Sequence, residues 1–295
     1  MLNKAQEIID LCREKNCHIY DLVIENECKT LKMTEEELRA YVDKVIEVMK
    51  DSAKSNLTKS DETRFKMIDG FSKITYKYAT DKEPIIGRFA AKAMAMAFST
   101  SEVNAAMGKI IAAPTAGSSG IMPAMLVAAS ERYNFDKETL QNGFLTSVGI
   151  GQIIGKYATF AGAEGGCQAE CGSASAMATS ALVEMLGGSP EEILNAASIT
   201  LINVLGLVCD PIAGLVQYPC TFRNASGVIN AFIAADLALA GVKSIVPFEE
   251  VVQAMSEVGT SLDEGLRETG LGGLAGTKTG QAIRKNFLNL EEKND

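Results

Sequence analysis

Apolar positions recur at helical spacing along most of the chain. The segment that follows Thr34 is the clearest case. Its apolar side chains fall on one face of a helix at Leu38, Val42, Val45, Ile46 and Met49. Thr34 and Glu37 form a capping box at its start. The spacing and the cap together predict a surface helix with one buried face.

Helix start signals appear again further along the chain. Ser189 and Pro190 place an N-cap before a proline at the first helical position, and predict a helix EEILNAASITLINVLG that ends at Gly206. Pro247 predicts the start of another, FEEVVQAMSEVG. Period-two alternation is scarce, and residues 72–80 (SKITYKYAT) are the one fair strand candidate, as a short hairpin arm. These patterns predict a mostly α-helical fold.

Charged residues are spread unevenly. Nearly half of them lie in residues 1–83, whereas residues 84–283 are poor in charge and rich in small side chains, as in CGSASAMATSALVEMLGG. Small side chains let helix backbones approach closely. We expect a charged helical segment over residues 1–83 packed on a compact multi-helix domain over residues 84–295, the two forming one structural domain.

Composition excludes two classes of protein. The 295-residue chain has a formal net charge of −9, which disfavours binding to a phosphate backbone. The charge-free run over residues 110–130 is as long as a membrane span, but Pro114, a Gly-Ser turn and Pro123 interrupt it. We therefore expect neither a nucleic-acid-binding protein nor a membrane protein.

Cysteine usage points to a reducing compartment. No signal peptide opens the chain, so we expect it to be cytoplasmic. The seven cysteines are an odd number, and in the cytoplasm thiols are buried, bound to metal or catalytic more often than paired.

Three loops of the charge-poor region have the composition of a ligand site. The first, AAPTAGSSGIMPA, offers the hydroxyls of Thr115, Ser118 and Ser119 ahead of a helix that begins near Ile121. Backbone N–H groups at such a helix start favour an anion such as a carboxylate. The alternative is an ordinary capped junction between a loop and a helix.

The other two loops carry thiols. Cys167 and Cys171 lie in AEGGCQAECGSASA, and Cys209 and Cys220 lie in GLVCDPIAGLVQYPC. Neighbouring Gly and Pro residues leave backbone N–H groups free to point at sulfur, which stabilises thiolates and tunes iron–sulfur clusters. Buried cysteine also behaves as a small hydrophobe, so packing is the competing interpretation. The three remaining cysteines lie in the amphipathic N-terminal region and are interpreted as structural: Cys12, Cys17 and Cys28.

The donor set narrows the choice of metal. His18 is the single histidine and lies in the charged N-terminal segment, and the cysteine spacing matches neither a zinc finger nor a ferredoxin. A [4Fe–4S] cluster held by three thiolates would leave one iron open to act as a Lewis acid.

Four blocks together carry a family resemblance. In order along the chain they are AAPTAGSSGIMPA, GGCQAECGSASAM, CDPIAGLVQYPCTFRNASG and LRETGLGGLAGTKTGQA. They resemble the α subunit of two-subunit, iron–sulfur-dependent L-serine dehydratase. The resemblance implies a largely helical fold, a [4Fe–4S] cluster on Cys167, Cys209 and Cys220, and elimination from L-serine to give pyruvate and ammonia. It also implies a separate β subunit in a hetero-oligomer.

The chain departs from that pattern at two places. Cys171 is an extra thiol one helical turn from Cys167, and we interpret it as packing. The chain ends EEKND, whereas single-chain relatives can end in a cysteine that reaches the cluster. Since His18 is distant in sequence from the thiol loops, we expect the general base to come from the β subunit.

Substrate contacts are expected from polar residues around the thiols. Thr115, Ser118 and Ser119 are the first candidates, and Arg223 and Asn224 are the second. Arg223 is equally consistent with a structural salt bridge, and Lys278 with an exposed lysine at a helix start.

Three other functions compete with serine dehydration. A related lyase acting on L-cysteine would use the same loops. A non-catalytic iron–sulfur sensor or electron carrier would have a four-coordinate cluster, with Cys171 as the further ligand. A pyridoxal-phosphate dehydratase would need a Schiff-base lysine, Lys109 or Lys278, but the chain lacks the βαβ pattern of such a fold.

Overall fold

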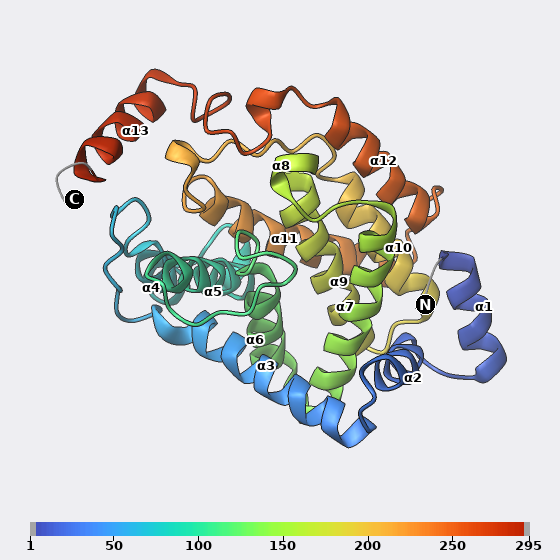
Figure 1. Cartoon of the computed structure of the whole chain (residues 1–295). Helices are drawn as coiled ribbons and strands as arrows, with labels where there is room; N and C mark the ends of the chain where they lie inside the picture. Colours follow the sequence, from blue (N-terminus) through green and yellow to red (C-terminus); the bar gives the residue numbers. More distant parts are fainter. Residues whose placement is uncertain (1–3, 292–295) are drawn as a thin grey trace.

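The computed structural model describes residues 4–291, and in them the chain forms helices and no strand. The mostly α-helical prediction is confirmed. The helices, in chain order (Figure 1), are α1 (Ala5–Lys15), α2 (Ile19–Leu31), α3 (Glu35–Ser55), α4 (Phe71–Asp81), α5 (Gly87–Ala105), α6 (Ile121–Tyr133), α7 (Lys137–Tyr157), α8 (Gly162–Gly165), α9 (Ser173–Met185), α10 (Pro190–Ile202), α11 (Cys220–Leu239), α12 (Phe248–Ser261) and α13 (Lys278–Glu291).

Helix α9 lies at the centre of the molecule. It packs against α7, α10, α11 and α6, and Figure 1 shows it enclosed by these helices, with α3 along one edge of the molecule and α12 along the opposite edge. Nearly all of its residues are buried. Because most of them are small, neighbouring helices come close: a Cβ on Gly143 of α7 would lie 2.9 Å from the carbonyl oxygen of Ala181.

The charged N-terminal helices cover this central bundle. Helix α3 packs on α5 and α6, and α2 packs on α7. The capping box of Thr34 and Glu37 is present at the start of α3, and the predicted apolar face is buried. None of the described helices is long and apolar enough to cross a bilayer.

Two local predictions need correction. The strand candidate over residues 72–80 is wrong, because this segment belongs to α4. Its β-branched and aromatic side chains favour a strand, but Ser72 and Ala79 lie seven residues apart on one buried helical face that packs on α5. The helix after Ser189 begins with the predicted cap but ends at Ile202, and an irregular segment leads on to Cys209.

Candidate active site

Cys167 lies at the turn that joins α8 to α9. It precedes a π-helical turn, Gln168–Gly172, that runs directly into α9. Gln168 fastens this turn to the next thiol loop, since its N–H donates to Leu207 O at 3.1 Å and its Oε1 accepts from Gly206 N at 2.8 Å. Isolated π-turns are frequent at functional sites, and this one fixes the direction in which Cys167 and Cys171 point.

Cys209 lies in an extended stretch beside a loop near the end of the chain. Its N–H donates to Leu266 O at 2.8 Å, and its carbonyl accepts from Glu268 N at 2.6 Å. The next residue, Asp210, accepts from Leu274 N at 2.7 Å. These bonds bring the fourth sequence block, LRETGLGGLAGTKTGQA, against the third.

Cys220 is the first residue of α11, and Asn224 one turn later ties this helix to the first block. Asn224 Nδ2 donates to Cys220 O at 2.9 Å and to Gly117 O at 2.7 Å, and Asn224 Oδ1 accepts from Gly120 N at 2.8 Å. Asn224, a predicted substrate contact, is therefore placed between two loops with its polar atoms engaged by backbone.

The three predicted cluster ligands lie in one buried region. Cys167, Cys209 and Cys220 are only 1%, 1% and 5% exposed. Burial raises the pKa of both the Cys209 and the Cys220 thiols well above the ordinary value, and the nearby charge of Cys167 raises them further. The thiols are thus close enough to influence one another, and binding a metal there must displace protons.

Cys167 and Cys171 form the tightest thiol contact at the site. Their sulfurs are 3.4 Å apart and share a hydrogen bond. This bond lowers the pKa of Cys167; burial opposes the shift and the positive charge of Arg223 supports it. The pKa of Cys171 is raised, first by the bond to Cys167 and then by burial. The shared bond therefore shifts the pKa values of the two thiols in opposite directions.

Glu170 is a buried carboxyl at the same site, and the sequence analysis missed it. Its Oε1 accepts from Thr115 Oγ1 at 2.9 Å, and its Oε2 lies 3.9 Å from Cys209 Sγ. Burial raises its pKa, partly offset by the Thr115 bond. The available signal was a carboxyl between two cysteines in a segment otherwise poor in charge.

The predicted substrate residues of the first loop are placed differently from one another. Thr115 faces Glu170, whereas Ser119 donates to Ala116 O at 2.7 Å inside its own loop. The Ser118 hydroxyl lies 3.1 Å from Thr115 Oγ1. Ser118 and Ser119 are both buried. Among the described residues, Thr115 is thus the one of these three hydroxyls that bonds a side chain beside the thiols.

The sequence left two interpretations of Arg223 open, a substrate contact and a structural salt bridge, and the structure is consistent with both. Its Nη2 pairs with Asp210 Oδ1 at 2.5 Å, so a structural salt bridge is present. Its Nη1 is buried without a partner in the described part of the chain. Burial lowers the pKa of Arg223, but Cys167 and Asp210 outweigh this effect and raise it. Lys278 is exposed at the first position of α13, as expected for a helix-start lysine.

Five of the nine buried polar side-chain atoms without a partner among the described residues lie in the second, third and fourth sequence blocks. Buried polar atoms are nearly always hydrogen-bonded, so an orphan calls for an explanation. Orphans in the described residues of these segments are Ser173 Oγ, Gln217 Oε1, Thr221 Oγ1, Arg223 Nη1 and Arg267 Nε. Five such atoms in these three blocks suit a bound polar or anionic group.

The donor set fits a polynuclear cluster better than a single ion. Among the described residues, no three His, Cys, Asp or Glu side chains converge closely enough to hold one metal ion. In an iron–sulfur cluster each thiolate binds a different iron, so the ligands surround the whole cluster and do not converge on one metal ion. Cys167, Cys209 and Cys220 are buried, come from three separate segments and are near enough for Cys167 to raise the pKa of the other two, as such a ligand set requires.

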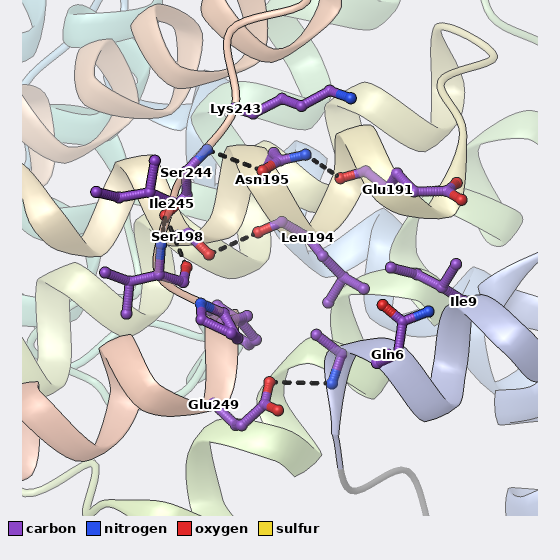
Figure 2. A pocket seen from close by; sticks show the side chains of 14 residues that line it. Gln6, Ile9, Glu191, Leu194, Asn195, Ser198, Lys243, Ser244, Ile245 and Glu249 are labelled. Atoms are coloured by element: carbon purple, nitrogen blue, oxygen red, sulfur yellow. Dashed lines mark hydrogen bonds between the residues drawn. The ribbon is translucent and has the colours of Figure 1, made fainter.

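A cleft reaches this region from the surface. It measures about 420 Å³, and its walls include Cys171, Ser175, Gly206, Arg223 and Ser226. A second pocket of about 310 Å³ lies between α1, α10 and the segment before α12 (Figure 2), where Ser244 N donates to Asn195 Oδ1. No thiol and no predicted site residue lines the second pocket, so the candidate chemistry belongs to the first.

His18 is remote from the thiols. It is the N-cap residue before α2, and its Nδ1 lies 2.9 Å from Glu184 Oε1 near the far end of α9. Cys167 precedes the opposite end of the same helix. At about 1.5 Å per residue the separation is roughly 20 Å. His18 therefore cannot serve as a base at this site.

Comparison with known proteins gives one family. Residues 14–275 match the family model described as serine dehydratase alpha chain. The L-serine dehydratase alpha chain of Peptoniphilus asaccharolyticus is 75% identical over 288 residues, covering 98% of this chain and 99% of that protein. The probable L-serine dehydratase alpha chain of Bacillus subtilis is 42% identical over 288 residues, covering 98% of this chain and 96% of that one.

A third relative is longer. The L-serine dehydratase of Streptomyces coelicolor is 35% identical over 282 residues, which cover 92% of this chain but 60% of that protein. The remainder of the Streptomyces protein lies outside the match.

Proposed function

The chain belongs to the serine dehydratase α-chain family, and we propose that it is the cluster-bearing subunit of an L-serine dehydratase, which converts L-serine to pyruvate and ammonia. The observation that carries the proposal is that three buried thiols from three distant segments influence one another's pKa, with orphaned polar atoms in the neighbouring sequence. Cysteines that only filled a core would not explain these buried polar atoms without hydrogen-bond partners.

Cys167, Cys209 and Cys220 are proposed to hold a [4Fe–4S] cluster. When bound by three thiolates, such a cluster keeps one iron free as a Lewis acid for a hydroxyl leaving group. The raised pKa values of Cys209 and Cys220 mean that the protein holds these thiols protonated until metal displaces the protons. Burial keeps water away from the same sulfurs.

Cys171 is not assigned as a fourth ligand. Its sulfur touches that of Cys167 at 3.4 Å, and thiolates on different irons of one cluster must stand further apart than two sulfurs in contact. This contact disfavours a four-coordinate, non-catalytic cluster in this arrangement of the loops.

Thr115, Glu170 and Arg223 are proposed to receive the substrate. Thr115 and Glu170 form a hydrogen-bonded pair beside Cys209, so each side chain has a fixed direction. The free Nη1 of Arg223 can donate to a carboxylate or support the negative charge of the thiolates. Because serine and cysteine share an amino acid end, these residues would orient either one, and an L-cysteine lyase stays the alternative.

A β subunit is proposed to complete the site. His18 lies roughly 20 Å from the thiols, as judged from the length of α9, so this chain offers no histidine base there. The longer Streptomyces relative contains a further segment that a separate subunit can replace. Apolar side chains near the thiol segments are also left exposed, including Phe222 at 43% and Leu271 at 60%. We propose that the β subunit covers this surface and supplies the base.

One experiment tests the core of the proposal. The chain is purified without oxygen, with its β subunit, as wild type, Cys209→Ala and the distant control Cys28→Ala. Iron, sulfide and serine turnover are then measured for each. Near four iron and four sulfide per chain with turnover are expected in wild type and control, and a sharp loss of all three in Cys209→Ala. Turnover by a protein without iron would contradict it.

A further inference from the structure

Cys171 is a thiol that the proposed ligand set leaves unused. It is buried, lies one turn after Cys167, and its sulfur is 3.4 Å from Cys167 Sγ. A disulfide bond needs about 2.05 Å between the sulfurs, so a combined movement of about 1.4 Å would join them. No large rearrangement is needed, because Cys167 directly precedes the π-helical turn that contains Cys171.

The pair can be reached from solvent. Cys171 forms part of the wall of the cleft of about 420 Å³, together with Arg223, Ser175 and Gly206. Hydrogen peroxide is little larger than water, so a space of this size admits it. Cys167 does not line the cleft but contacts Cys171, sulfur to sulfur, at 3.4 Å.

From this geometry we infer that Cys167 and Cys171 are a site of reversible oxidation, which closes to a disulfide when a peroxide enters the cleft of the cluster-free chain. One sulfur takes an oxygen from the peroxide, which releases one water and leaves a sulfenic acid. The other sulfur attacks it, forms the S–S bond and expels a second water. Overall two thiols lose two electrons and two protons, and one peroxide is reduced to two waters.

The bond would be easily reversed. Side chains four residues apart on a helix start with Cβ atoms about 5–6 Å apart, whereas a relaxed disulfide brings them to about 3.5–4.5 Å. Strained disulfides are reduced readily by small thiols, and reduction restores both cysteines. A cycle of closing and reopening is therefore chemically available.

If the proposed function holds, this disulfide would prevent the chain from binding its cluster. A sulfur bonded to Cys171 cannot act as a thiolate ligand, so oxidation would remove one of three ligands and block loading of iron. Reduction would restore loading. The pair would hold the empty site in a protected state, since a disulfide resists the further oxidation that destroys a thiol.

The cross-link can be tested directly on the full chain freed of iron by a chelator. The chain is treated with one equivalent of hydrogen peroxide, free thiols are alkylated, and an endoproteinase that cuts after glutamate is added. Cleavage after Glu164, Glu170 and Glu184 separates the two cysteines into different peptides. Mass spectrometry should find Gly165–Glu170 joined to Cys171–Glu184, and a thiol reductant should separate them. Cys167 found alkylated, or joined to the peptide of Cys209 and Cys220, would overturn the inference.

A second readout follows iron uptake without turnover. Wild type, Cys171→Ala and the distant control Cys28→Ala are treated with peroxide and then offered iron and sulfide without reductant. Wild type and control should bind little iron at first and regain uptake when reductant is added, whereas Cys171→Ala, whose oxidised Cys167 has no partner thiol, should stay roughly tenfold lower after reductant. Equal uptake by reductant-treated wild type and Cys171→Ala would refute the protective role. Because the cross-link is read from the iron-free chain, its result does not depend on whether the enzyme dehydrates serine.

Discussion

Arg223 Nη2 donates a hydrogen bond to the buried carboxylate of Asp210 at 2.5 Å, while Arg223 Nη1 is left without a partner in the described structure. Asp210 also accepts from Leu274 N at 2.7 Å. Asp210 therefore holds one side of a guanidinium whose charge lowers the pKa of Cys167, and it joins the third sequence block to the fourth.

Asp210→Asn should destabilise the site through Arg223. The variant leaves a buried guanidinium without its counter-charge, and breaking a buried pair in this way costs about 3–5 kcal/mol. We expect the free energy of unfolding of the α chain to fall by about 3 kcal/mol and its iron content to fall with it. Urea unfolding measures the first and iron analysis the second. The exposed Asp81→Asn is the control, and equal stability of the two variants would contradict the role given to the Asp210–Arg223 pair.

Glu170→Gln should damage substrate handling and spare the cluster. Glutamine keeps an acceptor for Thr115 but removes the carboxyl beside Cys209. Since hydrogen bonds to charged groups contribute about 1.5–3 kcal/mol, kcat/KM for L-serine should fall roughly tenfold to a hundredfold with iron content near that of wild type. The matched control is the exposed Glu164→Gln. Unchanged kcat/KM in Glu170→Gln would remove this residue from the proposed site.

Asn224→Ala tests whether Asn224 contacts the substrate or holds the surrounding loops together. The substitution leaves Gly120 N, Gly117 O and Cys220 O without their partner, so a stability loss of about 3 kcal/mol is expected. A structural Asn224 predicts lower stability and lower iron content, with KM unchanged in the fraction of enzyme that retains its cluster. Unaltered stability with a raised KM would restore the substrate contact predicted from the sequence. Asn26→Ala is a half-buried control.

Sequence and structure agree most where the information is local or chemical. The capping residues Thr34 and Ser189 predicted helix starts that the structure confirms, since a cap depends on neighbours three residues away. The thiol loops were found by their cysteines and glycines. Glu170 and Asp210 were missed because their partners, Thr115 and Leu274, lie 55 and 64 residues away, and no spacing rule links segments so distant. The strand predicted over residues 72–80 failed because packing of α4 on α5 overrode β propensity.

Glu102 should make the stability of the chain depend on pH. Its carboxyl is buried in α5, accepts from Ser72 N at 2.9 Å, and has its pKa raised by burial from 4.5 to about 7. The folded chain therefore holds this proton more tightly than the unfolded chain. The associated stability is complete below pH 4.5 and is lost as pH rises through about 7.

Glu102→Gln should remove that dependence. Relative to wild type, the variant should gain about 3 kcal/mol in free energy of unfolding between pH 4 and pH 8, because each pKa unit corresponds to about 1.4 kcal/mol. Urea titrations at the two pH values give the comparison, with the exposed Glu36→Gln as control. A constant difference between Glu102→Gln and wild type across this range would show that Glu102 does not hold a proton in the folded chain.

Leu271→Asp should weaken association with the β subunit without unfolding the α chain. Leu271 belongs to the fourth block, next to the residues that contact Asp210, and its side chain is 60% exposed. An exposed substitution usually changes stability by no more than about 0.5 kcal/mol, whereas a charge placed in an apolar interface opposes docking. We expect roughly tenfold less β subunit to co-purify, with turnover recovering when excess β subunit is added. Ile74→Asp on α4, 67% exposed, provides a control of similar exposure. If Leu271→Asp retained the β subunit as Ile74→Asp does, the docking surface would have to lie elsewhere, and the base proposed to arrive with it would need another route to the thiols.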